Sequence, residues 1–240
     1  MIDIHSHVLF GMDDGAQNID TSIDMCRDAY ENGCDVLVLT PHFVDYKNLS
    51  EFVEERDRRI KVLSEILQEE DIPLKLVAGA EIFLNDKIFS VNSFDALAIN
   101  KSRYILCEFP LGPFNTNHVT MWFDELLDRG YIPILAHPER YVELHRNYDL
   151  MDEILDRPIL MQINIDSLRG KYGSAPQDMA VDLVKRGFAH FMASDAHDPV
   201  YRHTRLTEKL EDMHEDITDD IIEKFMKINP LKVLNNKDII

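Results

Sequence analysis

Short apolar segments recur along the whole chain, separated by longer polar ones. Each apolar segment is four to seven residues long, rich in Val, Ile and Leu, and bounded by turn or helix signals. A strand that is buried on both faces has this appearance in sequence. Seven segments fit the description, and they cover residues 1–4, 35–40, 74–80, 104–107, 132–136, 160–165 and 190–194.

Helix signals lie between several of these predicted strands. A polar residue able to cap the first turn opens each stretch, and glycine or a polar turn closes it. We expect helices from Asp20 or Thr21 to Gly33, from Ser50 to about Asp71, from Thr116 to Gly130, and from Ser174 to Gly187.

Strands and helices therefore alternate, which favours a parallel sheet with crossover helices. Seven strands are enough to close a barrel, so we predict an α/β fold, an irregular (β/α)7 barrel formed by a single domain over residues 1–240. In such barrels the carboxyl ends of the strands gather on one face, and that face carries the active site. Residues that are far apart in the sequence then become neighbours.

Histidines and acids follow the predicted strands. His5 and His7 are alternate residues at a strand end and point to the same side, where two uncharged imidazoles gain little without a cation. Glu81 and Glu108 follow apolar runs, where an unpaired buried carboxylate is costly and a cation compensates it. For Glu108, an ion pair with a nearby basic residue is the alternative.

The same face would collect further candidates from other segments. Imidazole and carboxylate ligands without Cys suit Mn, Fe or Zn, and the candidates outnumber the roughly four ligands that one tetrahedral ion needs. More than one ion is implied, because carboxylates can bridge ions ~3.5–4 Å apart in sites that transfer phosphoryl groups. The further candidates are Asp14, His42, His137 and Asp195.

The charge balance restricts the partners. The chain carries 25 basic and 44 acidic residues, a formal charge of −19. Because affinity for nucleic acid comes from neutralising phosphates with Lys and Arg, we expect no nucleic-acid partner. No basic segment followed by an apolar stretch opens the sequence, and no apolar run approaches the ~18 residues that cross a bilayer. We therefore expect a cytoplasmic protein without membrane insertion.

The three cysteines lie within helix or strand patterns and lack CxxC spacing, so we interpret them as reduced thiols. A Cys that acts as a nucleophile on a phosphate ester is followed by an Arg six residues further on. The positions six residues after Cys26, Cys34 and Cys107 hold Asn32, Thr40 and Pro113. The sequence therefore excludes the Cys-dependent mechanism.

Seven ordered motifs span nearly the whole chain: His5-Ser-His7, Asp13-Asp14-Gly15, Thr40-Pro-His42, Gly79-Ala-Glu81, Glu108-Phe-Pro, Ala136-His137-Pro-Glu-Arg140-Tyr and Ala193-Ser-Asp195-Ala-His197. Together they resemble the polymerase-and-histidinol-phosphatase (PHP) superfamily. The resemblance is narrower to its bacterial manganese-dependent protein-tyrosine phosphatases of the capsule and exopolysaccharide type.

This resemblance implies a site for three divalent ions, with Mn²⁺ first and Fe or Zn as alternatives. One ion would be held by His5, His7, Glu81 and Asp195, a second by Glu81, Glu108 and His137, and a third by Asp14, His42 and His197.

The resemblance also implies residues that act on the substrate. Arg140 and Arg202 would face the phosphate, whose geometry a guanidinium matches bidentately. His42 is a candidate general acid. Whether Asn164 or Asp166 enters the site stays open, and the loop 110–116 would border it and shape specificity.

The implied activity is metal-dependent hydrolysis of phosphotyrosine in a protein, namely a membrane-associated tyrosine kinase that controls capsule or exopolysaccharide synthesis. Three alternatives stay open. They are a small-molecule phosphatase of the histidinol-phosphate type, a PHP exonuclease, which the acidic charge disfavours, and a non-catalytic metal-binding or kinase-docking protein. The sequence fixes neither the kinase nor the oligomeric state.

Overall fold

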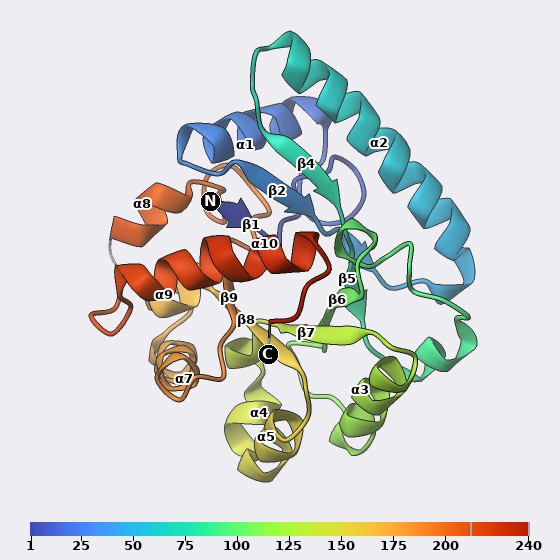
Figure 1. Cartoon of the computed structure of the whole chain (residues 1–240), viewed down its shortest axis with the longest axis vertical. Coiled ribbons are helices and arrows are strands. Elements are labelled where there is room, and N and C mark those ends of the chain that lie inside the picture. The colour runs from blue at the N-terminus through green and yellow to red at the C-terminus, as the bar shows by residue number, and fades with distance from the viewer. Residues whose placement is uncertain (212, 240) are drawn as a thin grey trace.

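The computed structural model describes residues 1–211 and 213–239. Parallel strands form its centre, and helices surround them (Figure 1). One hydrogen-bonded group of strands contains, in this order, β1 (Ile2–Asp3), β2 (Val36–Leu39) and β4 (Lys75–Ala78). The other contains, in this order, β3 (His42–Phe43), β5 (Glu81–Phe83), β6 (Tyr104–Glu108), β7 (Ile132–Ala136), β8 (Leu160–Asn164) and β9 (Phe191–Ala193).

The two groups belong to one barrel. β3 follows β2 and β5 follows β4 after short interruptions, and backbone hydrogen bonds between residues 39–41 and 79–81 continue across them. On the other side, Ser6 forms a parallel bridge with Ala196, whose carbonyl accepts from His7 N at 2.8 Å. All seven predicted strands therefore occur, and the prediction of a (β/α)7 barrel is confirmed.

The interruptions of the second and third strands lie directly before candidate ligands. Pro41 has no N–H to donate, so the ladder breaks before His42. At Gly79, a Cβ atom would lie 3.1 Å from the side chain of Val38, so the two strands approach closely there. The second strand resumes at His42 and the third at Glu81, which places both residues on the carboxyl face.

Helices cover the outside of the barrel (Figure 1). Four match the predicted helices: α1 (Ile19–Glu31), α2 (Leu49–Glu69), α3 (Val119–Asp128) and α7 (Ser174–Lys185). Shorter ones are α4 (Val142–Arg146), α5 (Tyr148–Leu155), α6 (Ile165–Leu168), α8 (Leu206–Glu211), α9 (Asp219–Glu223) and α10 (Asn229–Leu234). Single 3₁₀ turns cover Tyr46–Asn48, Asp86–Ser90, Ile99–Lys101, Thr116–His118 and Pro138–Arg140, and a π-helical turn covers Lys224–Ile228.

Two predicted helix starts are wrong. Asn18 caps α1, and its Oδ1 accepts from Thr21 N at 3.0 Å, so neither Asp20 nor Thr21 is the cap. Ser50 lies inside α2, which begins one residue earlier. At α1 several neighbouring polar residues offer the same capping chemistry, and the path of the loop selects Asn18. At α2 the residue before the helix, Asn48, makes no side-chain capping bond.

Apolar side chains inside the barrel fill its amino end. Tyr104, Leu160 and Phe191, each at the start of a strand, are buried there. α10 crosses this end (Figure 1), and its Val233 belongs to the same apolar cluster. The hydroxyl of Tyr104 donates to the carbonyl of Lys237 at 2.6 Å, which fastens the chain after α10. The amino end of the barrel is therefore packed with apolar side chains and covered by the C-terminal segment.

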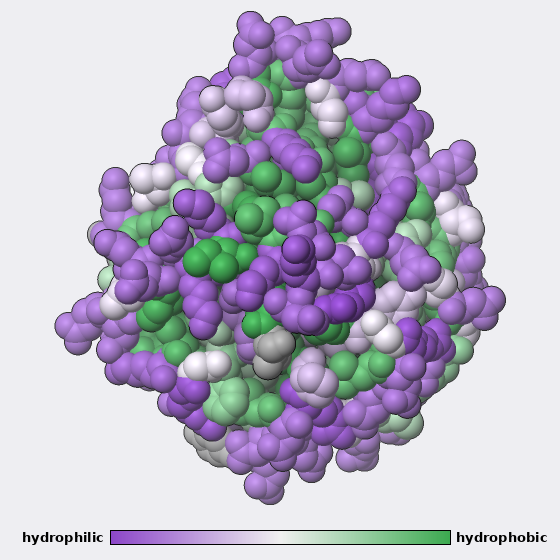
Figure 2. Space-filling view, viewed as in Figure 1, coloured by the Kyte–Doolittle hydropathy of each residue, from purple (hydrophilic) through white to green (hydrophobic). Residues whose placement is uncertain are grey.

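Hydrophilic side chains cover most of the face shown in Figure 2, with apolar patches between them. No helix in the described part of the chain combines the length and the apolar character needed to cross a membrane.

The packed interior predicts a large stability difference between two leucines. Leu160 is 1% exposed inside the barrel and Leu231 on α10 is 51% exposed. We expect Leu160→Ala to lower the free energy of unfolding by about 2–5 kcal/mol, because it removes buried methyl groups and leaves a cavity. Leu231→Ala should change it by about 0.5 kcal/mol or less. Urea unfolding followed by circular dichroism measures both, and equal losses would contradict a close-packed amino end.

Candidate metal centre

The nine predicted metal ligands lie together at the carboxyl end of the barrel. Their ligand atoms form four overlapping sets, and within each set all atoms lie within 4.8 Å of one another. The sets are His7, Asp14, His42 and His197; His5, His7 and Glu81; His5, His137 and Asp195; and His42, Glu81 and Glu108. Because the sets share members, the site is one continuous cluster. The assignment of ligands to three separate ions stays a prediction.

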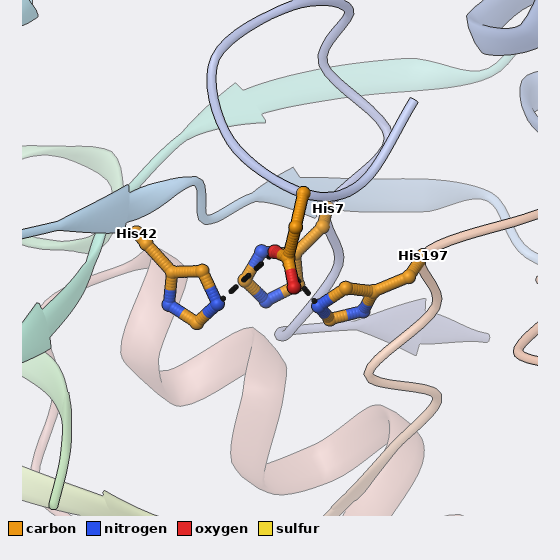
Figure 3. A group of neighbouring side chains, drawn as sticks. His7, His42 and His197 are labelled. Atoms are coloured by element: carbon orange, nitrogen blue, oxygen red, sulfur yellow. Dashed lines mark ion pairs between the residues drawn. The ribbon is translucent and has the colours of Figure 1, made fainter. Parts of the chain in front are cut away.

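Three imidazoles from three segments face one another in Figure 3. The ring centroid of His7 lies 3.9 Å from that of His197 and 4.4 Å from that of His42. Asp14 Oδ1 lies 3.4 Å from His42 Nε2 and 3.5 Å from His197 Nε2. Three imidazoles and a carboxylate are a donor set that suits a first-row transition ion.

Glu81 is the most heavily shared residue of the cluster. Its fully buried Oε2 lies 3.2 Å from the Nε2 atoms of His5 and His7 and 3.0 Å from Nδ1 of His42, yet it has no hydrogen-bond partner. Its Oε1 lies 3.1 Å from His137 Nε2. Burial raises the pKa of Glu81, but the histidines, His5 first, outweigh burial and hold this pKa well below its usual range. Glu81 is therefore a carboxylate that needs positive charge around it.

The outer nitrogens of two histidines fix their tautomers. His5 Nδ1 lies 2.7 Å from Gln162 Oε1, while Gln162 Nε2 donates to Asn164 at 2.9 Å, so His5 donates from Nδ1. His7 Nδ1 likewise donates to the carboxylate of Asp13 at 2.7 Å. The two Nε2 atoms lie 3.1 Å apart, and both face the carboxylates of the cluster. Burial lowers the pKa of both imidazoles, but the carboxylates, Glu81 for His5 and Asp13 with Glu81 for His7, outweigh burial and raise it. A metal cation that bound here would take the place of these protons among the carboxylates.

Asp13 has a role that the sequence left unassigned. Its Oδ2 also accepts from His42 N at 2.9 Å, and its Oδ1 accepts from Gly15 N at 2.9 Å. Burial raises the pKa of Asp13, but the bond with His7 outweighs burial, and the pKa falls to about 2. Asp13 thus holds two candidate ligand residues from outside the cluster, while its neighbour Asp14 faces inward.

Both predicted phosphate-binding arginines reach the cluster through Asp195. Arg140 Nη1 lies 2.9 Å and Arg202 Nη2 lies 2.6 Å from Asp195 Oδ2, and Asn164 donates to the same oxygen at 2.8 Å. Asp195 Oδ1 instead faces His5 Nε2 at 3.4 Å. Burial raises the pKa of Asp195, but His5, then Arg202 and other cations, lower it well below its usual range.

The structure also decides between the two residues that the sequence left open after β8. Asn164 belongs to the site because it contacts Asp195. Asp166 is turned away from it and lies 3.0 Å from the buried Lys209 Nζ and 3.1 Å from Lys171 Nζ.

A cavity of about 280 Å³ opens above the cluster. Arg140, Arg202 and His42 contribute to its wall, together with Pro110 and Leu111 from the predicted bordering loop. Phe114 of the same loop turns inward and stacks on Phe109, with ring centroids 5.2 Å apart. Pro110 and Leu111 therefore border the site, whereas Phe114 packs against Phe109.

Known proteins share both the fold and much of the sequence. A solved structure from work on YwqE of Bacillus subtilis and CpsB of Streptococcus pneumoniae, described as metal-dependent tyrosine phosphatases, superposes with a TM-score of 0.86 at 33% identity over 100% of this chain and 96% of that one. The tyrosine-protein phosphatase YwqE of Bacillus subtilis is 36% identical over 213 residues, 88% of this chain and 82% of its own. CapC of Staphylococcus aureus is 32% identical over 240 residues, 99% of this chain and 92% of its own. The family model for capsular polysaccharide synthesis proteins of the CpsB/CapC type matches residues 1–235, and the chain belongs to that family.

Proposed function

We propose that this chain is a metal-dependent protein-tyrosine phosphatase whose single domain carries the whole active site. The observation that carries the proposal is the buried Glu81 oxygen that faces three imidazole nitrogens without a hydrogen bond, in a cluster whose cavity is lined by two arginines. YwqE of Bacillus subtilis and CpsB of Streptococcus pneumoniae are both named tyrosine-protein phosphatases. These names support phosphotyrosine in a protein as the substrate class.

The nine clustered residues would hold the ions, and we propose Mn²⁺ because the donors are imidazole nitrogens and carboxylate oxygens without a thiolate. When bound, such ions supply a hydroxide nucleophile at neutral pH and positive charge for the phosphoryl oxygens. Asp13 and Gln162 would orient His7 and His5 for this task from outside the cluster.

Arg140 and Arg202 would bind the phosphate. Each guanidinium has five N–H donors, so the contact with Asp195 leaves others for phosphate oxygens. Tyr172 supports Arg140 from behind, since the guanidinium carbon lies 4.6 Å from the centre of its ring. The two arginines would fix the ester in front of the cluster.

Of the nine clustered residues, His42 is the one that we also propose as the proton donor to the leaving phenol, from the ring nitrogen that does not hold an ion. Its side chain is 25% exposed, and it lines the cavity between Asp14 and Glu108. A phenol leaves with a pKa of about 10, so the demand for an acid is mild.

A thiolate does not compete for the role of nucleophile. Cys26, Cys34 and Cys107 are all buried, and burial raises the pKa of each thiol. Three reduced thiols also favour a cytoplasmic protein, which we propose here. Since the family is named for capsular polysaccharide synthesis, we further propose that the substrate is a membrane-associated tyrosine kinase of that system.

Metal removal tests the proposed function. Metal-stripped protein should release no phosphate, and added Mn²⁺ should restore turnover of a phosphotyrosine peptide. His5→Ala should lower this turnover at least about 100-fold, because the buried cluster loses a ligand. Phosphate release is measured with the peptide and with histidinol phosphate in parallel. A preference for histidinol phosphate would replace the proposed substrate class, and turnover of neither would overturn the phosphatase.

Asp13→Asn tests the residue behind His7 and His42. We expect Mn²⁺ affinity to fall about 10–100-fold, because the imidazole of His7 loses the carboxylate that orients it and the backbone N–H of His42 loses a charged acceptor. Asp20→Asn, an exposed carboxylate on α1, should leave the affinity unchanged. Calorimetric titration of stripped protein gives both values. Wild-type affinity in the first variant would show that Asp13 has no part in the site.

Arg202→Lys tests phosphate binding separately from metal binding. A lysine keeps the charge but loses the bidentate fork, so kcat/KM should fall about 10–100-fold with unchanged Mn²⁺ affinity. Arg186→Lys, at an exposed arginine on α7, is the matched control. A variant of Arg202 with wild-type kcat/KM would remove this residue from the proposed mechanism.

A further inference from the structure

A groove lies beside the cavity that opens above the candidate metal cluster, and the two share part of their wall. The groove has a volume of about 500 Å³ and lies between the first turns of α2 and the loops that follow β1 and β3. His42 lines both the groove and the metal cavity. A polypeptide whose phosphotyrosine enters the cavity would therefore lie next to this groove.

Apolar side chains form part of the wall of this groove. Val44 is 55% exposed although it is β-branched and apolar, and Met12 and Phe52 line the groove beside it. Phe52 is held in place by Phe43, with ring centroids 5.0 Å apart. An open apolar surface of this kind, beside a candidate active site, is suited to covering an apolar side chain of a partner.

The charged side chains of the groove are mainly acidic. Arg58 and Arg59 are both engaged by Glu55, at distances of 2.6–2.8 Å. Glu51 and Glu54, by contrast, are exposed, and no ion pair with them is found among the described residues. Their carboxylates favour a basic side chain in the groove and disfavour an acidic one.

The loop after β1 forms one wall of the groove and contacts α2. Gly11 has a φ of +62°, a backbone conformation that residues other than glycine rarely adopt, and a Cβ atom there would lie 2.6 Å from Arg59 Nη1. The same guanidinium donates to the carbonyl of Phe10 and lies over its ring at 5.3 Å. These contacts fasten the loop after β1 to α2 at the edge of the groove.

We propose that this groove binds the residues of the protein substrate that flank the phosphotyrosine, and that it selects a basic residue together with an apolar one. An extended peptide advances ~3.4 Å per residue, so the residues within about three positions of the phosphotyrosine would reach the groove. The inference rests on the proposed phosphatase activity and adds the sequence preference of its substrate.

The test compares the Mn²⁺-loaded enzyme on three phosphotyrosine peptides that differ only in their flanks, which are Lys and Leu, Ser and Ala, or Glu and Ala. Wild type should prefer the Lys/Leu peptide over the Ser/Ala peptide in kcat/KM, mainly through KM. In E51Q/E54Q this preference should fall about 3- to 20-fold, because two exposed charge pairs are lost. In E51K/E54K it should invert in favour of the Glu/Ala peptide.

E65Q/E69Q is the matched control, because it removes two exposed carboxylates from the same helix outside the groove. It should keep the wild-type preference. Equal kcat/KM for all three peptides in wild type, or the same preference in all variants, would overturn the groove and leave the phosphatase intact. Failure of wild type on every peptide would overturn both. A changed oligomeric state of E51K/E54K by light scattering, with unchanged peptide preference, would assign the groove to a second copy of the chain.

Discussion

The arrangement of the site depends on the burial of Glu81 and Asp195. Both carboxylates are almost completely removed from water, and a buried carboxylate without compensating charge is strongly unfavourable. Neighbouring histidines, joined at Asp195 by Arg202, keep both ionised, which is why the pKa of each lies well below its usual range. A metal ion bound beside these carboxylates would supply the same compensation that the protonated imidazoles supply.

The barrel fold brings these two carboxylates together. Glu81 and Asp195 are 114 residues apart in sequence, yet their strands end on the same face because all the strand pairs are parallel. Contacts made by three buried charged residues, Asp3, Asp166 and Lys209, lie below that face. Asp3 accepts from the backbone N–H groups of His5 and Ser194 at 3.3 and 3.2 Å, and Lys209 Nζ contacts Asp166 on the neighbouring strand end at 3.0 Å. These contacts tie the first and last strands together beneath the candidate ligands.

The sequence predicted what depends on local pattern. Strands buried on both faces appear as apolar runs, and the residue after each run lies on the carboxyl face, so ligand candidates such as Glu81 and His137 followed from position alone. Two features escaped because they depend on tertiary contacts. Gln162 lies inside an apolar run, and nothing in its surroundings indicates that it contacts His5, 157 residues away. Asp13 differs from Asp14 only in the direction that a tight loop gives its side chain.

Asp195 connects the metal cluster with phosphate recognition. One of its oxygens faces His5, and the other contacts Arg140 and Arg202. The negative charge of Asp195 is balanced by His5 and by these arginines, which are thereby engaged by the protein itself. A metal ion on the His5 side would add to that balance and weaken the hold of Asp195 on the two guanidiniums. The donors that we propose for phosphate would then become available as the cluster fills, and they would concentrate positive charge at one point of a protein whose net charge is −19.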